Sequence, residues 1–142
     1  AQKIGKQKPA LIHNIMIPAL EGPGGKMSAS DEKGTIYTTD SPSEVKKKIN
    51  KHAFSGGQPD IEQHRKLGGN PDIDVSYQYL RIFFEPDDDK LKIIYEDYKS
   101  GKLLSGELKA ILIEKINAFL AIHQENREKA KNQIDQFLFE NK

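Results

Sequence analysis

Helix-start signals follow one another after residue 40, and they constrain the fold more than any other feature of this chain. Ser41-Pro42-Ser43-Glu44 is a capping box with proline at the first helical position, which predicts a helix to about Lys51. Four further helices are expected, starting near Asp60, Asn70, Pro86 and Ser105. Gly68-Gly69 ends the second helix and Gly101 the fourth. The fifth continues, or breaks and resumes, through Ile134 to Leu138.

Apolar side chains recur at helical spacing within the last three expected helices, so each of these helices has one face to bury. These positions are Ile73, Tyr77, Leu80 and Phe84 on the third helix, Leu91, Ile94, Tyr95 and Tyr98 on the fourth, and Leu108, Ile111, Leu112, Ile116, Phe119 and Leu120 on the fifth. The aromatic residues of the third helix are interpreted as core rather than as platforms for stacking bases. They are Tyr77, Tyr79, Phe83 and Phe84.

Residues 1–40 have a different pattern. The segment Leu11–Ile17 is short and rich in isoleucine, which predicts a strand, and Glu21–Gly25 is expected to be a loop. Thr35–Thr39 alternates and suits a short extended segment. Because this piece is too small to bury the apolar run from Leu11 to Leu20, we expect that run to belong to a sheet whose other strands lie upstream. The opening without Met agrees with a piece of a longer protein.

Composition excludes several classes of protein. The chain has 142 residues, of which 36% are hydrophobic and 30% charged, and this predicts a compact globular domain rather than a disordered tail. No run approaches the roughly 20 apolar residues that span a bilayer. Cysteine is absent, which excludes disulfides and cysteine-based zinc sites and suits the cytoplasm. Since the net charge is only +1, any nucleic-acid binding must use local basic patches.

A glycine-rich segment carries the clearest chemical signal. In Gly22-Pro23-Gly24-Gly25-Lys26-Met27-Ser28-Ala29-Ser30, backbone N–H groups can approach phosphate oxygens, while a lysine adds charge and two serines add hydroxyl donors. It is not a Walker A loop, because Met27 follows the lysine and no helix signal appears before Ser41. From these residues alone, a phosphate-binding loop and a plain surface loop both stay open.

The string Lys26-Met27-Ser28-Ala29-Ser30 resembles the KMSKS signature of class I aminoacyl-tRNA synthetases, in its KMSAS form. Further blocks resemble the eukaryotic and archaeal tryptophanyl-tRNA synthetases and occur in that family's order. They are Lys8-Pro9-Ala10-Leu11-Ile12-His13, Asn50-Lys51-His52-Ala53-Phe54-Ser55-Gly56-Gly57, Gly68-Gly69-Asn70, Asp72-Ile73-Asp74-Val75-Ser76 and Ser105-Gly106-Glu107-Leu108-Lys109. The tyrosyl enzymes are the nearest relatives, and the block ending at Gly57 favours the tryptophanyl branch.

This resemblance implies a fold and a division of the chain. The expected fold class is mostly α, with a short β and loop remnant of a Rossmann-type catalytic domain in residues 1–40, which carries the KMSAS loop. A helical anticodon-binding domain would follow in residues 41–142. The HIGH-type motif and the amino-acid pocket of the family are missing here, so we expect this chain alone to be inactive. The parent protein is expected to be a homodimer and this piece a monomer.

The resemblance also implies a reaction, in which ATP with Mg²⁺ activates tryptophan for transfer to tRNA(Trp). Lys26 is expected to be the catalytic phosphate contact, since Ala29 stands where many relatives have a second lysine. Ser28 and Ser30 would bind phosphate oxygens, the Met27 main chain would lie near the adenine or ribose, and Gly25 would help the loop close. No metal ligand set is expected within this chain.

A lysine cluster and a later lysine are the candidate tRNA contacts. The run Lys46, Lys47, Lys48 and Lys51 is either a solvated helix face or a phosphate-binding face. The resemblance associates Lys109 and the loop of Gln58, Pro59 and Asp60 with the anticodon, with Asp60 replacing an acidic residue expected one position earlier.

His64 and His123 are interpreted as surface residues, and His52 as a partner contact or a cap for the carbonyl groups at its helix end.

The alternative function is a free-standing helical RNA-binding or scaffold module that uses no ATP. The glycine-rich loop of residues 22–30 distinguishes the two, because a pure binding module has no use for it.

Overall fold

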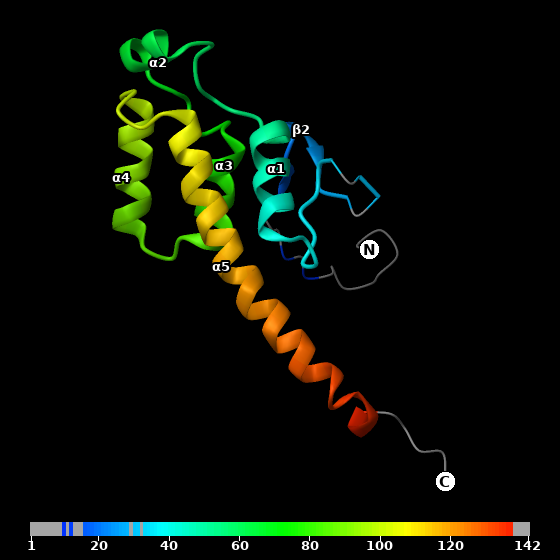
Figure 1. Ribbon diagram of the computed structural model, residues 1–142. Coiled ribbons are helices and arrows are strands. Elements are labelled where there is room, and N and C mark those ends of the chain that lie inside the picture. The colour runs from blue at the N-terminus through cyan, green and yellow to red at the C-terminus, as the bar shows by residue number, and fades with distance from the viewer. Residues whose placement is uncertain (1–9, 11, 13–15, 29, 32, 138–142) are drawn as a thin grey trace, which may run out of the picture.

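The computed structural model describes residues 10, 12, 16–28, 30–31 and 33–137. Figure 1 shows a mostly helical chain with one small hairpin near its beginning. The hairpin consists of β1 (Pro18–Ala19) and β2 (Gly22–Lys26), and the helices are α1 (Pro42–His52), α2 (Ile61–Leu67), α3 (Val75–Tyr79), α4 (Asp88–Lys99) and α5 (Ser105–Lys131). A π-helical turn, η2 (Leu80–Phe84), continues α3, and a 3-10 turn, η3 (Ile134–Phe137), follows α5.

The hairpin corrects two expectations about the first 40 residues. The glycine-rich segment expected to be a loop forms β2, which pairs antiparallel with β1 through a register with an irregularity after Pro18. Of the strand expected over 11–17, residues 11 and 13–15 lie outside the described part of the chain, and Met16 and Ile17 are not in a strand. Residues 35–39 form no strand either, because turns and side-chain hydrogen bonds hold this segment instead.

The helix caps explain where the helices begin. Ser41 and Glu44 form the expected capping box of α1, and the Asp60 carboxylate accepts the Gln63 N–H at the start of α2. The third helix was expected to start at Asn70, but it starts at Val75 because the Asp74 carboxylate accepts the N–H groups of its first turn. The fourth starts two residues after Pro86, capped by Asp87. The fifth breaks after Lys131 and resumes as η3, one of the two courses expected for it.

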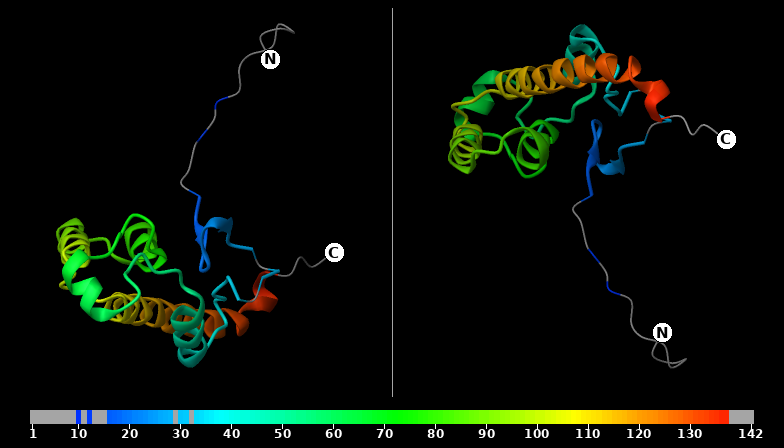
Figure 2. Two further views of the ribbon diagram at one scale, coloured as in Figure 1. Left: turned by 90° about the horizontal axis from the view of Figure 1, so that it is seen from above. Right: turned by 90° about the horizontal axis from the view of Figure 1, so that it is seen from below.

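α5 organises the core. It contacts α1, α3, η2 and α4. Its buried stripe is Leu108, Leu112, Ile116 and Leu120. Figures 1 and 2 show α2, α3 and α4 grouped around the first half of α5, while its second half extends beyond them. Leu20, next to the hairpin, is fully buried in the same core as the helical residues, so the first 40 residues pack directly onto the helices.

The aromatic expectation is confirmed for three residues and corrected for one. Tyr77 and Tyr79 are buried, and Phe84 packs against the core. Phe83 is 51% exposed and lines the same open pocket as the similarly exposed Phe119 of α5, so it is at the margin of the core. The π-helical turn accounts for this, because one extra residue per turn rotates the following side chains away from the ideal helical face.

Within the described residues, no helix combines the length and the apolar character that crossing a bilayer requires.

Candidate nucleic-acid interface and phosphate loop

A buried carboxylate and a buried tyrosine form the polar centre of the helical part. Asp74 Oδ2 accepts hydrogen bonds from the Gly56 N–H at 2.9 Å and from the Tyr98 hydroxyl at 2.8 Å. Its Oδ1 accepts the N–H groups of Ser76 and Tyr77. Since Asp74 and Tyr98 are 1% and 0% exposed, this network ties the loop before α2 to α3 and α4. Burial raises the pKa of Tyr98 to about 12.

His64 belongs to this centre, which corrects its interpretation as a surface residue. It is 2% exposed, and its ring lies 5.2 Å from that of Tyr98. Nδ1 accepts the Gln58 N–H, while Nε2 lies 3.0 Å from the Leu103 carbonyl oxygen. The imidazole therefore holds the loop before α2 against the loop before α5. His52 lies in the last turn of α1, and His123 is half-buried.

Close packing explains the glycine at position 57. A Cβ there would collide with Ser105 Oγ and would lie 3.0 Å from His64 Nδ1. Ser105 Oγ is also 2.9 Å from the Tyr98 hydroxyl. The start of α5 therefore lies against the loop after α1, with no room for a side chain at residue 57. Only glycine at residue 57 permits this approach.

This packing leaves an open cavity of about 370 Å³ between the two loops. Its walls are Gln58, Pro59, Asp60, Ile61, His64, Leu104, Ser105, Gly106 and Glu107. The structure thus brings together two of the expected contacts, Gln58 and Asp60. Sequence reasoning did not identify the carboxylate of Glu107 as part of this cavity, although its place three residues after Leu104 is a helix-start signal.

Lys109 lies on the same helix but is not part of the cavity wall. It is half-buried, and burial lowers its pKa, against the Coulombic attraction of Asp74. No carboxylate in the described part of the chain lies within ion-pair distance of its ammonium group. Keeping a partly desolvated cation without an ion pair costs stability, and such groups concentrate at functional sites.

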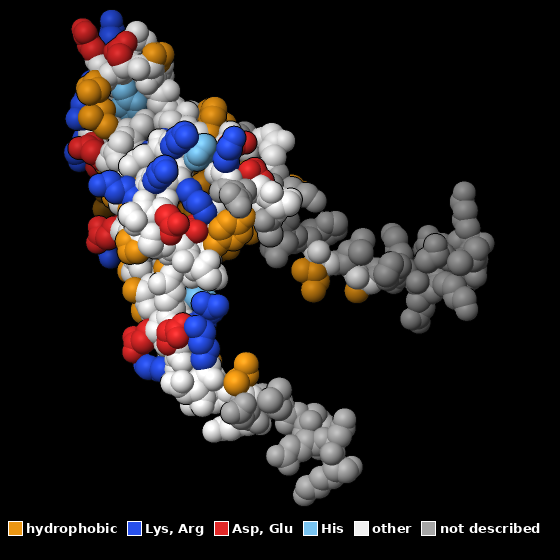
Figure 3. All heavy atoms as spheres, turned by 45° about the vertical axis from the view of Figure 1, so that its right-hand side comes forward, with side chains coloured by type: hydrophobic (Ala, Val, Ile, Leu, Met, Phe, Trp, Pro, Cys, Tyr) orange, Lys and Arg blue, Asp and Glu red, His pale blue; other side chains and the backbone are white. Residues whose placement is uncertain are grey.

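The lysine run of α1 divides into two parts. Lys46, Lys47 and Lys51 are exposed, whereas Lys48 turns toward the preceding segment and pairs with Asp40 at 2.6 Å. On the face drawn in Figure 3, several lysine and arginine side chains lie close together, with acidic side chains among them. Lys47 and Lys51 line a second open cavity of about 460 Å³, together with Lys33 and His52.

Residues 22–26 of the expected phosphate loop form β2, and Met27, Ser28 and Ser30 of its KMSAS string come after that strand. The Met27 side chain is partly buried and packs against the core. Ser28 Oγ and Ser30 Oγ lie 2.9 Å apart, and the Thr35 hydroxyl donates to the Ser28 carbonyl at 2.7 Å. The side chain of Lys26, and residue 29 as a whole, lie outside the described part of the chain. Gly25 lies within β2, with the Ala19 Cβ as the nearest neighbour of any side chain placed there.

Comparison with known proteins assigns the family. The model of the class I tRNA synthetases (W and Y) matches residues 1–121. The chain therefore belongs to this family, as the KMSAS string and the other sequence blocks predicted.

The relatives point to the tryptophanyl branch. The chain is 57% identical over 140 residues to the tryptophan–tRNA ligase of Sulfurisphaera tokodaii, covering 99% of this chain and 37% of that protein. It is 52% identical over 134 residues to the cytoplasmic human tryptophan–tRNA ligase, covering 94% of this chain and 28% of that protein. The chain thus spans 37% or less of the length of these curated relatives.

Solved structures agree with this assignment to the tryptophanyl branch. The tryptophanyl-tRNA synthetase of Giardia lamblia superposes with a TM-score of 0.76 at 48% identity, over 80% of this chain and 28% of that one. The tyrosyl-tRNA synthetase of Aeropyrum pernix has a TM-score of 0.64 at 23% identity, over 85% of this chain and 36% of that one. The second comparison shows a shared fold. The mostly α fold class expected from the sequence is confirmed as part of a class I synthetase.

Proposed function

We propose that this chain is the part of a tryptophan–tRNA ligase that contributes the ATP-phosphate loop and the anticodon-binding helices. The observation that carries the proposal is the 57% identity to a tryptophan–tRNA ligase over almost the whole chain. Residues 1–40 form the edge of the catalytic domain and residues 41–142 the anticodon-binding domain. The chain alone forms no adenylate, because the amino-acid pocket lies elsewhere in the intact enzyme, which is a cytoplasmic homodimer.

The reaction assigned to the phosphate loop is adenylate formation. The tryptophan carboxylate attacks the α-phosphate of ATP, and magnesium pyrophosphate leaves. Lys26 stabilises the charge on the phosphates, while Ser28 and Ser30 exchange their mutual hydrogen bond for phosphate oxygens. We assign Mg²⁺ to the ATP phosphates, because this ion is usually bound through substrate phosphates and water.

The tRNA contacts fall into two kinds. Lys46, Lys47 and Lys51 are exposed along α1 and attract phosphates regardless of sequence. Gln58 and Asp60 line the cavity between α2 and α5, where an extruded anticodon base can meet hydrogen-bonding groups.

One oxygen of Asp60 is available for such a base. Its Oδ1 accepts the Gln63 N–H at 2.8 Å, while in the described part of the chain Oδ2 accepts no hydrogen bond. An amino group of a base can donate to that oxygen.

Lys109 supplies the charge beside this cavity. Its ammonium group is partly desolvated and has no ion pair among the described residues, so a ligand phosphate or base carbonyl would satisfy it. A contact made by a desolvated cation is stronger than one made by a fully hydrated lysine.

Binding isotherms with tRNA(Trp) and an anticodon-swapped tRNA, each at two salt concentrations, test this assignment. We expect Lys109→Ala to narrow the gap between the two tRNAs by about 1–3 kcal/mol, the size of one good base contact. Lys46→Ala should weaken binding of both tRNAs equally and reduce the salt dependence. Equal losses for both tRNAs in Lys109→Ala would make that residue a phosphate contact. No preference of the wild-type protein for tRNA(Trp) would favour the free-standing RNA-binding module.

A further inference from the structure

Residues 33–41 form the loop segment, which joins the phosphate loop to α1. They contain no helix or strand, yet buried side chains hold them in place. Thr35 and Asp40 are 5% and 7% exposed, and Ile36 between them packs against the core. The Thr35 hydroxyl donates to the carbonyl of Ser28, which is a residue of the KMSAS string. One end of this segment is therefore attached to the phosphate loop itself.

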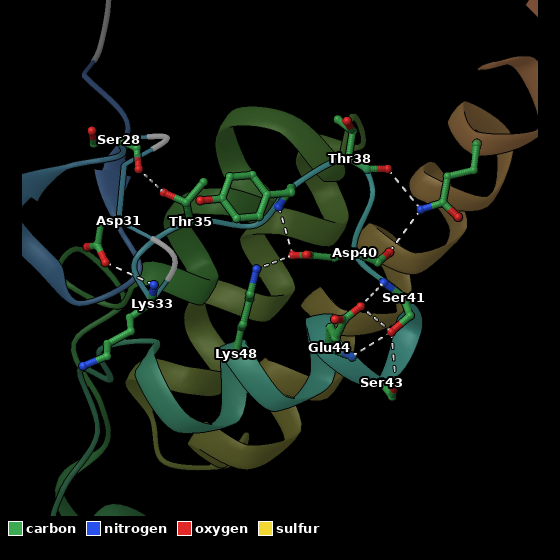
Figure 4. Close-up of polar contacts among 12 residues, drawn as sticks. Ser28, Asp31, Lys33, Thr35, Thr38, Asp40, Ser41, Ser43, Glu44 and Lys48 are labelled. Carbon is green, nitrogen blue, oxygen red and sulfur yellow. Dashed lines mark hydrogen bonds and ion pairs between the residues drawn. The ribbon is translucent and has the colours of Figure 1, made fainter. Parts of the chain in front are cut away.

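Asp40 and Lys48 hold the other end, as Figure 4 shows. The Asp40 carboxylate accepts the Tyr37 N–H at 2.9 Å and the Lys48 ammonium at 2.6 Å. The same ammonium lies 4.5 Å from the centre of the Tyr37 ring, which adds a cation–π contact. The side chains of Lys48 and Asp40 are only 18% and 9% exposed, so solvent screens this pair weakly.

A third contact comes from α5. Gln124 Nε2 donates to the carbonyls of Thr38 and Asp40, each at 3.0 Å. Gln124 follows the last buried residue of the α5 stripe, Leu120, by one turn. The segment is thus clamped between two helices that are themselves fixed by the core.

We propose that Asp40, Lys48 and Gln124 are positioning residues for the phosphate loop. They fix the point from which the loop extends, so that Ser28 and Ser30 meet the ATP phosphates in the correct place. The three residues contact neither ATP nor tryptophan. They act on the loop through Thr35 and the Ser28 carbonyl. This inference rests on the proposed ligase function.

The free-energy cost of burying the Asp40–Lys48 ion pair supports a positioning role for it. A largely buried ion pair gains little net stability over apolar side chains of similar volume. Lys48 also leaves the exposed lysine face of its helix to reach Asp40, which lies eight residues earlier. The pair does, however, impose one geometry on a segment without regular structure. Misplacing a reacting group by about 1 Å can lower a rate on the order of 10²-fold.

Tryptophan-dependent pyrophosphate exchange by the intact ligase tests the inference. We expect Lys48→Met and Gln124→Ala each to lower kcat/KM for ATP by roughly 10-fold or more, since each loosens the phosphate loop. The KM for tryptophan should stay within about twofold, because these residues are placed only at the loop. Lys48→Arg keeps the charge and should restore part of the loss.

Two control variants separate positioning from stability. Lys90→Met removes an exposed ion pair with Asp87 on α4, far from the loop segment. Leu91→Ala removes a buried side chain of α4 and lowers the melting temperature without touching residues 33–41. Both should keep the ATP parameters of the wild-type enzyme at temperatures well below unfolding.

Wild-type-like ATP parameters in Lys48→Met and Gln124→Ala, with only the melting temperature lowered, would overturn the inference and leave the ligase function intact. A parallel rise in the KM for tryptophan and the KM for ATP would also overturn the inference, because it would indicate that the whole active site is disturbed. If the wild-type intact protein shows no tryptophan-dependent exchange, the proposed function itself fails. Should Lys48→Met not fold, Gln124→Ala and Lys48→Arg still decide the question.

Discussion

Replacing Asp74 tests whether one carboxylate holds the helical part together. In Asp74→Ala, α3 loses its N-cap, which typically costs about 1 kcal/mol. The Gly56 N–H becomes a buried donor without its partner, at a cost of roughly 1–3 kcal/mol. Tyr98 is less affected, because its hydroxyl keeps the hydroxyl groups of Ser55 and Ser105 within reach. The sum is a loss of about 3 kcal/mol in the free energy of unfolding.

Urea unfolding of the chain, followed by circular dichroism, measures this loss. Asp87→Ala is the matched control, because Asp87 also accepts two N–H groups at a helix start, on α4, but is not buried. The control should lose only the cap contribution of about 1 kcal/mol. The slope of the free energy with urea should be unchanged in both variants, since the native fold is kept.

Asp74→Asn refines the test. The amide oxygen can keep the cap bonds to Ser76 and Tyr77, while the NH₂ group faces the Gly56 N–H. We expect a loss between those of wild type and Asp74→Ala. If Asp74→Ala costs no more than Asp87→Ala, the bonds to Gly56 and Tyr98 add nothing beyond the cap, and the reasoning about a buried centre is refuted.

Three further results are expected. Burial raises the pKa of Tyr98 to about 12, so the stability that this residue contributes is complete below pH 10 and is lost as the pH rises toward 12. In Tyr98→Phe, the unfolding free energy should therefore decrease less between pH 10 and pH 12. Gly57→Ala should lower the unfolding free energy by about 1–3 kcal/mol in urea unfolding, because its Cβ would meet Ser105 Oγ. In the intact ligase, Lys26→Ala should slow pyrophosphate exchange by about 10²–10³-fold while tryptophan binding changes little, since it removes one charge contact at the phosphates.

The helix boundaries were predictable wherever a local signal decides them. The Ser41 capping box and the Gly101 stop depend only on residues within one turn, and the structure has both. The start of the third helix was not predictable, because Asn70 and Asp74 are both good cap residues. Distant partners decide between them: Asp74 is fixed by Gly56 and Tyr98, whereas the Asn70 side chain accepts the Asp72 N–H in a turn.

The burial of His64 could not be predicted from its neighbours in the chain. α2 has seven residues and only one of them is buried, so its sequence shows no apolar stripe. The ring contacts Leu103 and Tyr98, which come more than 30 residues later. Pairs of glycines on both sides of α2 were the available signal, because consecutive glycines permit close approach of another part of the chain.

Which lysines of α1 form an ion pair could not be predicted from the sequence either. Four lysines in six positions look equivalent in the sequence, yet α1 directs Lys48 toward Asp40 and leaves the other three exposed. The helix period separates these directions, but it cannot indicate that an acidic partner lies beside one of them. The division into a solvated face and an internal ion pair therefore required the three-dimensional structure.

The sequence blocks that resemble the tryptophanyl family converge on one place in the fold. Gly57, Gly69, Asp74 and Ser105 lie around the Tyr98 ring and hydroxyl, and the Gly56 N–H bonds to the same Asp74 carboxylate. These residues are needed to pack the two loops together, so they define the shape of the cavity rather than its chemistry. Under the proposed function, we expect any discrimination among anticodons to come from side chains on the cavity wall and beside it, such as Asp60, Glu107 and Lys109. Exchanging these side chains should change which tRNA binds while leaving the surrounding fold intact.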